Sequence, residues 1–178
     1  MATLKKLNII GACNDGADYF NQFDTSADFV KNCHIGDWII WLFARTNPDD
    51  LKRLTLAKSF CAATVINKMP DKRSIDAVHT GIMFGLGFRT KEQLKTASDA
   101  ANAAYDTSSA ASSYAAYSSY AAAAYAIDAS AAASSAANAA ANVANATYAD
   151  NVAKKQNQQL TSDFCRKLLP IEIWNFGE

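Results

Sequence analysis

Apolar residues recur along the first half of the chain at spacings of three and four, which is the pattern of amphipathic helices. One face of a first helix would carry Ile10, Cys13, Ala17 and Phe20. Residues 38–43 (WIIWLF) are apolar nearly all round, which is typical of a buried helix. No segment shows the sustained alternation of apolar and polar residues that marks a half-buried strand. The pattern therefore predicts helices from end to end.

Short polar residues and prolines mark where these helices should begin. Residues 25–28 (TSAD) and 90–93 (TKEQ) resemble capping boxes, in which two side chains bond the free backbone N–H groups of a helix start. Residues 47–50 (NPDD) offer Asn47 as N-cap, then a proline and two acids. Pro70 and Asp71 predict a further helix, which should end among three glycines between residues 81 and 87.

The second half is dominated by alanine. Residues 101–150 contain 24 Ala, nine Ser and six Tyr, and no Gly or Pro occurs from Phe88 to Leu169. Because alanine has the highest helix propensity, we expect helix throughout this tract. A single helix over 91–169 would be roughly 120 Å long, so the tract must fold back at least once. The break could lie near residues 106–109, near Asp128 or within 142–145, and the small side chains would let the helices pack closely.

A last helix would carry Leu160, Phe164 and Leu168 on one side and stop at Pro170. The expected fold is all-α, a compact single-domain bundle of about seven or eight helices with closely packed Ala-rich helices in its C-terminal half. Its parts are a short-helix half (1–89), an Ala/Ser/Tyr-rich long-helix half (90–169) and an apolar tail (170–178).

Charge excludes two classes of partner. The 17 basic and 17 acidic residues cancel, and the calculated pI is near 6.7, so no electrostatic signature of a nucleic-acid-binding protein is present. The uncharged runs 107–127 and 129–149 are as long as membrane spans. They are rich in Ser, Asn and Tyr and nearly lack Leu, Ile, Val and Phe, so we expect no membrane insertion.

Candidate chemistry is sparse. The four cysteines contain no C-x-x-C pair, which favours buried free thiols in a reducing cytoplasm. Cys33, His34 and His79 lack the paired spacing of a structural zinc site, and the glycines near residue 85 are not followed by the Lys-Ser or Lys-Thr of a phosphate loop. We therefore predict no metal, no cofactor and no catalytic residues.

Three segments together resemble one known family. They are residues 12–20 (ACNDGADYF), 36–42 (GDWIIWL) and 70–77 (PDKRSIDA), followed by the Ala/Tyr/Ser tract. This arrangement is similar to that of small Ala-rich helical proteins of bacteria and phages that are named immunity proteins, of an Imm-5-like type. The resemblance extends from about residue 7 to residue 169. It implies a non-enzymatic protein that binds another protein and neutralises it by occlusion, with a phage or mobile-element origin.

The two most specific segments supply the candidate partner-binding residues. They are Asp37, Trp38 and Trp41 on one helix and Asp71 and Arg73 at the start of another. Large aromatic residues in an apolar run favour a core position, so the charged pair is the better candidate for partner contact. Two other functions stay open: a structural or self-assembling helical module that forms homo-oligomers, and a small helical hydrolase.

Overall fold

The computed structural model describes residues 14–69, 71–106 and 151–173. Every regular element in these ranges is a helix, which confirms the all-α prediction. The elements are α1 (Asn14–Phe20), α2 (Ser26–Asn32), α3 (Gly36–Thr46), α4 (Leu51–Ala63), the 3-10 turn η2 (Ile66–Lys68), α5 (Lys72–Gly85), α6 (Lys91–Asp106), α9 (Asn151–Leu168) and the 3-10 turn η3 (Ile171–Ile173).

Several sequence predictions concern residues outside these ranges. They include the breaks in the alanine tract between residues 107 and 150, the close packing of its helices, and the contribution of Ile10 and Cys13 to the first helix. The two uncharged runs, 107–127 and 129–149, also lie there. None of the helices among the described residues combines the length and the hydrophobicity needed to cross a membrane.

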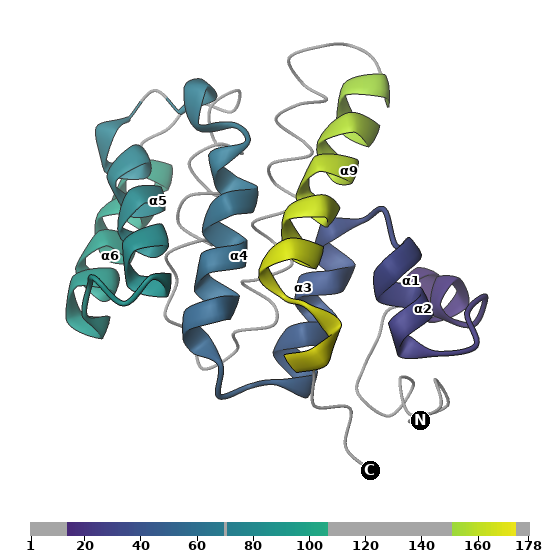
Figure 1. The fold of residues 1–178 in the computed structure, drawn as a ribbon. Helices are drawn as coiled ribbons and strands as arrows, with labels where there is room; N and C mark the ends of the chain where they lie inside the picture. Colours follow the sequence, from purple (N-terminus) through teal and green to yellow (C-terminus); the bar gives the residue numbers. More distant parts are fainter. Residues whose placement is uncertain (1–13, 70, 107–150, 174–178) are drawn as a thin grey trace.

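Helix α4 lies at the centre of the described part, as Figure 1 shows. It packs against α5 on one side and against α3 and α9 on the other, and α6 packs against α5. The largest hydrophobic cluster joins α1–α4 to the end of α9, where Phe20 and Phe29 have ring centroids 3.7 Å apart. Each fully buried side chain of this size contributes roughly 1.5–3 kcal/mol to folding.

The predicted helix starts are largely confirmed. The Thr25 hydroxyl accepts a hydrogen bond from the Asp28 N–H at 3.0 Å at the start of α2. Before α6, the Thr90 N–H donates to Gln93 Oε1 at 3.0 Å and the Gln93 N–H donates to Thr90 Oγ1 at 3.3 Å, which completes the reciprocal capping box. Helix α5 starts after Asp71, whose carboxylate caps it.

The predicted start of α4 at Asn47 is wrong by three residues. Asn47 instead closes α3, because its N–H donates to the Phe43 carbonyl at 2.8 Å. The Asp50 N–H bonds to the Asn47 carbonyl in a turn, and the Asp50 carboxylate accepts from the Arg53 N–H at 3.2 Å. The turn leaves no room for a helix before Asp50, so this residue takes the capping role.

The apolar side of α9 is only partly buried, because Leu168 packs against the main core whereas Leu160 is exposed. Leu160 is 45% exposed, and the buried residues on this helix are Asn157, Thr161, Ser162 and Cys165. The reason is steric: a Cβ added to Gly36 would lie 2.6 Å from Thr161 Oγ1 and 2.9 Å from the Thr161 carbonyl carbon. Helices α3 and α9 approach too closely for a leucine at the contact.

Small residues also make the contact between α4 and α5. A Cβ on Gly81 would lie 2.1 Å from Ser59 Oγ, and a Cβ on Gly85 would lie 2.6 Å from the Cβ of Leu56. The Ser59 hydroxyl is buried and has no hydrogen-bond partner among the described residues. Close approach, rather than hydrogen bonding, therefore explains the small side chain at this position.

We predict that Gly81→Ala destabilises the protein by roughly 1–3 kcal/mol through overpacking. Ser59→Ala alone should be neutral or slightly stabilising, because it removes a buried hydroxyl without a partner. Combined with Gly81→Ala, it should restore most of the lost stability, since the next atom is then 3.3 Å away. Urea denaturation of the four proteins measures this coupling, and additive effects would contradict the contact.

In the part of the chain that the structure describes, one charged side chain is fully buried. Lys58 of α4 has no exposed surface, and this burial lowers the pKa of its ammonium from 10.5 to about 8. Because the folded-state pKa is the lower one, unfolding takes up a proton between these two values. The free energy of unfolding should therefore rise with pH in this window.

We expect the free energy of unfolding of the wild type to rise, relative to that of Lys58→Met, as the pH increases from 8 to 10.5. The gain should be on the order of 3 kcal/mol at most, given 1.36 kcal/mol for each pKa unit. Urea denaturation of both proteins across this range is the measurement. Lys52→Met, which changes an exposed lysine on the same helix, is the control and should follow the wild-type profile.

Candidate partner-binding site

The five residues singled out in the sequence do not form one site. Asp37, Trp38 and Trp41 belong to α3, which packs with α4 and α9 in the main core. Asp71 and Arg73 stand at the start of α5, which packs on the other side of α4. The structure therefore offers two separate locations, each with its own chemistry.

The two tryptophans are half-buried and pack against the main core. The Trp38 ring lies 5.0 Å from the Tyr19 ring, centroid to centroid, in a tilted arrangement. The guanidinium of Arg45 lies 5.7 Å from the centre of the Trp41 ring, within cation–π range. These contacts hold both rings in place and give them a structural role.

Asp71 and Arg73 form an ion pair with each other. Arg73 Nη2 lies 2.7 Å from Asp71 Oδ2, and Arg73 Nε donates to Asp71 Oδ1 at 3.0 Å. The Asp71 carboxylate also accepts the Arg73 N–H at 2.8 Å as the cap of α5. The hydrogen bonds from Arg73 lower the pKa of Asp71. A partner would have to bind the pair as a unit or compete with these bonds.

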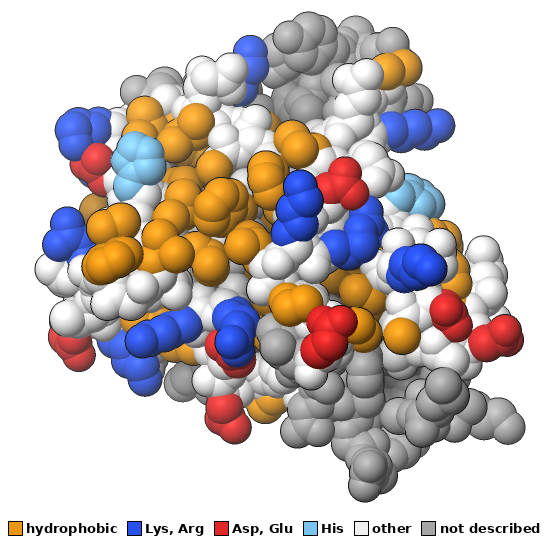
Figure 2. Space-filling model, viewed as in Figure 1, with side chains coloured by type: hydrophobic (Ala, Val, Ile, Leu, Met, Phe, Trp, Pro, Cys, Tyr) orange, Lys and Arg blue, Asp and Glu red, His pale blue; other side chains and the backbone are white. Residues whose placement is uncertain are grey.

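A large apolar surface lies elsewhere, across three helices. Figure 2 shows hydrophobic side chains gathered over α5 and α4 and extending toward α9. We call this surface the apolar face. Its members are exposed or half-buried: Leu56 and Phe60 of α4, Ile82 and Met83 of α5 with Leu86 at its end, and Leu160 and Phe164 of α9.

Contacts between the helices make the apolar face continuous. Gly85 of α5 meets the side chain of Leu56, and the rings of Phe60 and Phe164 lie 5.6 Å apart between α4 and α9. Leu86 is 53% exposed, and Phe88 in the following turn is 68% exposed. Contiguous exposed apolar surface of this kind is characteristic of sites that contact a protein, a membrane or a ligand.

Sequence reasoning missed the apolar face, although a signal was present. Gly81 and Gly85 are four residues apart, so they lie on one side of α5 and mark a close contact with another helix. Ile82 and Leu86 form a second stripe, displaced by one residue from the glycines. A helix that packs through its glycines must turn its large apolar side chains elsewhere.

Most charges beside the apolar face are positive. Within one helical turn of its members on α4 and α9 stand four exposed or half-buried basic residues and one carboxylate: Lys52, Arg53, Arg166, Lys167 and Asp163. Lys58 is also within this range but is fully buried, and Arg89 follows Leu86 by three residues. Asp163 is paired with Arg166, and Arg53 is paired with Asp50. Although the chain as a whole is neutral, the border of this face is cationic.

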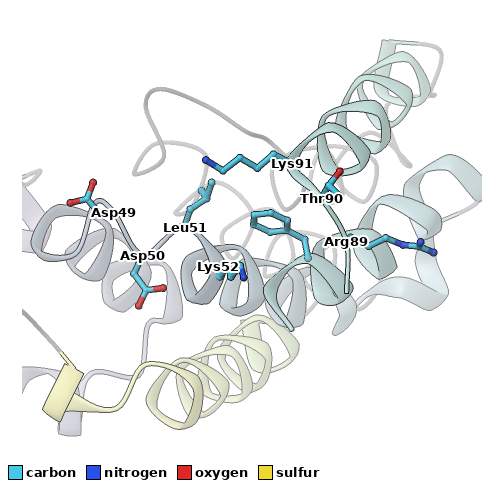
Figure 3. Close-up of a pocket in the computed structure, with 8 residues that line it drawn as sticks. Asp49, Asp50, Leu51, Lys52, Arg89, Thr90 and Lys91 are labelled. Atoms are coloured by element: carbon cyan, nitrogen blue, oxygen red, sulfur yellow. The ribbon is translucent and has the colours of Figure 1, made fainter. Parts of the chain in front are cut away.

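A cavity of about 430 Å³ lies near the starts of α4 and α6. Figure 3 shows that the Lys91 side chain extends toward Leu51 and that Arg89 points away from it. Its remaining lining residues are Asp49, Asp50, Lys52, Phe84 and Thr90. Because charges of both signs surround an apolar floor, the cavity favours no single class of ligand.

The described cysteines lie in the core, and the two histidines lie on the surface. Cys33, Cys61 and Cys165 are buried free thiols, as the sequence predicts, and Cys13 lies outside the described residues. The Sγ atoms of Cys61 and Cys165 are 3.8 Å apart, and burial raises the pKa of the Cys33 thiol to about 12.

His34 and His79 do not join Cys33 in a shared site. His34 contacts the Tyr19 hydroxyl through Nδ1 at 3.2 Å, and His79 is exposed on α5. Across the described residues, no group of three His, Cys, Asp or Glu side chains is arranged to hold a metal ion.

No family model, curated protein or solved structure matches this chain. The similarity to immunity proteins therefore remains a prediction from the sequence. The geometry of the candidate site is the independent basis for any functional argument.

We predict that Trp38→Ala lowers the free energy of unfolding by roughly 3 kcal/mol, the low end of the range for aromatic truncation, because the ring is half-buried. Arg73→Ala should leave stability almost unchanged, since the Arg73–Asp71 pair is exposed. Thermal and urea denaturation measure both effects. A Trp38→Ala protein that unfolds like the wild type would show that the ring is not part of the core.

Proposed function

We propose that this chain is a non-enzymatic protein-binding factor of immunity or anti-defence type, which neutralises another protein by covering part of its surface. The single observation that carries the proposal is the apolar face on α4, α5 and α9. Monomeric proteins rarely keep large contiguous apolar surface in water without a use for it. The sequence similarity to immunity proteins supports the same class of function.

The arrangement suits occlusion. The apolar face belongs to packed helices, so a partner meets a surface that is already formed and little entropy is lost on ordering it. Leu86 at the end of α5 and Leu160 on α9 are both exposed. A partner that contacts both would have the matching part of its own surface covered. The buried free thiols support a reducing compartment such as the cytoplasm.

The alternative is self-assembly. The same apolar face could pair two copies of the chain, which is the structural-module function left open by the sequence. The two functions differ in the composition of the complex, because one contains a foreign protein in fixed ratio and the other contains only this chain.

We expect affinity purification of the tagged full chain from its native cells to yield one foreign protein in a stoichiometric ratio, and Leu160→Glu to abolish the complex. The matched control is Val152→Glu, because Val152 is 52% exposed on the same helix but lies outside the apolar face. It should retain the partner. Both variants should keep the wild-type thermal midpoint, since both sites are exposed.

Mass photometry and quantitative mass spectrometry of the complex give its composition. A complex that contains only this chain would replace the proposal with self-assembly. Equal loss of the partner in both variants would show that the apolar face is not the binding surface.

A further inference from the structure

We propose that the element which docks on the apolar face is an amphipathic α-helix of the partner with acidic residues beside its apolar stripe. This inference rests on the proposed function and specifies the chemistry of the partner. Three properties of the face carry it: its helical construction, the sign of the charges around it, and the lack of self-complementarity that follows from that sign.

The first property is that the apolar face consists of side chains on helices. Within the described residues no strand offers a free edge, so an extended peptide could not complete its backbone hydrogen bonds by joining a sheet. A helix satisfies its own backbone hydrogen bonds and presents apolar side chains at spacings of three and four. A helix is therefore the element that can bury Leu56, Phe60 and Leu160 without leaving polar backbone groups unpaired.

The second property is charge. Lys52 and Lys167 beside the apolar face, and Arg89 in the turn after Leu86, make no ion pair with any described carboxylate. Lys52 stands four residues before Leu56, and Lys167 stands three residues after Phe164, so each is a helical neighbour of a face residue. Acidic residues flanking the apolar stripe of a docked helix would meet these cations, which favours fast and specific association.

The third property is that the face does not complement itself. In a two-fold dimer built on this surface, each copy would bring its own cationic border to the interface. Like charges facing each other across an interface disfavour the complex. A second copy is therefore a poorer occupant than an acidic helix.

A lipid surface also fits less well. Anionic headgroups would attract Lys52 and Lys167, but a bilayer presents a continuous anionic surface, which would also meet Asp163 in this border and Asp50 next to it. The acidic residues of a single helix can instead lie opposite the cations alone. Both carboxylates are engaged by arginines of this chain, in the pairs Arg53–Asp50 and Arg166–Asp163. Mixed but predominantly positive charge is what a folded protein surface with acidic side chains accommodates.

The test uses two synthetic peptides of about 18 residues, long enough for five helical turns. Both carry leucines along one face; one has glutamates and the other has lysines beside this stripe. Fluorescence anisotropy with the full chain should give about tenfold tighter binding of the glutamate peptide at an ionic strength near 0.05 M. This preference should shrink at about 0.5 M, where charges are screened.

Matched variants assign the binding to the apolar face. Leu160→Gln should weaken binding of the glutamate peptide, and Val152→Gln should leave it unchanged. Lys167→Glu should weaken binding of the glutamate peptide and strengthen binding of the lysine peptide. Lys31→Glu changes the net charge by the same amount but lies on α2, so it should alter the binding of neither peptide. Equal binding of the two peptides, or equal effects of Lys167→Glu and Lys31→Glu, would overturn the inference.

Two further measurements separate the other occupants. Sedimentation velocity that shows a dimer lost in Leu160→Gln would identify a second copy as the occupant. Co-sedimentation with vesicles of phosphatidylserine and phosphatidylcholine that is lost in Leu160→Gln would identify a membrane. Either result overturns the acidic-helix inference.

The peptide test and the purification from cells fail independently. If the cellular partner depends on Leu160 while the peptides do not discriminate by charge, the protein-binding function stands and its partner is not an acidic helix. If the glutamate peptide binds as expected but no foreign protein is captured, the chemistry of the face stands and the proposed function fails.

Discussion

Close contact between helices through small side chains is the interaction on which the described bundle depends. Gly36 lets α9 approach α3 at Thr161, and Gly81 lets α5 approach α4 at Ser59. Such contacts gain many favourable dispersion interactions, because the helix surfaces meet along their length. They also tolerate little added volume, since even one Cβ would lie within 3 Å of its neighbour.

The same constraint explains the surface. A helix that places glycine, serine or threonine at its contacts must place its larger apolar residues elsewhere, and Leu86 and Leu160 are the result. The aromatic and branched residues of α2 and α3, such as Phe29 and Ile39, supply large buried side chains to the core instead. The close helix contacts and the exposed residues of the apolar face thus lie on different sides of the same helices, so an exposed residue such as Leu160 can be changed without removing one of these contacts.

Most described ion pairs are local, and the positive excess lies beside the apolar face. Several pairs, such as Lys72 with Asp76 and Lys95 with Asp99, join neighbours on one helix and contribute little to stability because they are exposed. The border of the apolar face keeps a positive excess within a chain of zero net charge. The positive excess is therefore local to this border and is not a property of the whole chain.

The sequence by itself determined the helical class, most helix starts and the buried thiols, because capping and helix propensity act over three or four residues. Thr90 and Gln93 form their capping box as their spacing requires, and Asp71 caps α5. Only the tertiary structure decided which side of each helix is buried. The pattern at Leu160 and Phe164 marks an apolar stripe, but Thr161 makes the close contact with Gly36, and Leu160 is left exposed. A contact between residues 125 positions apart leaves no local signal, so the exposed side of α9 could not be read from spacing alone.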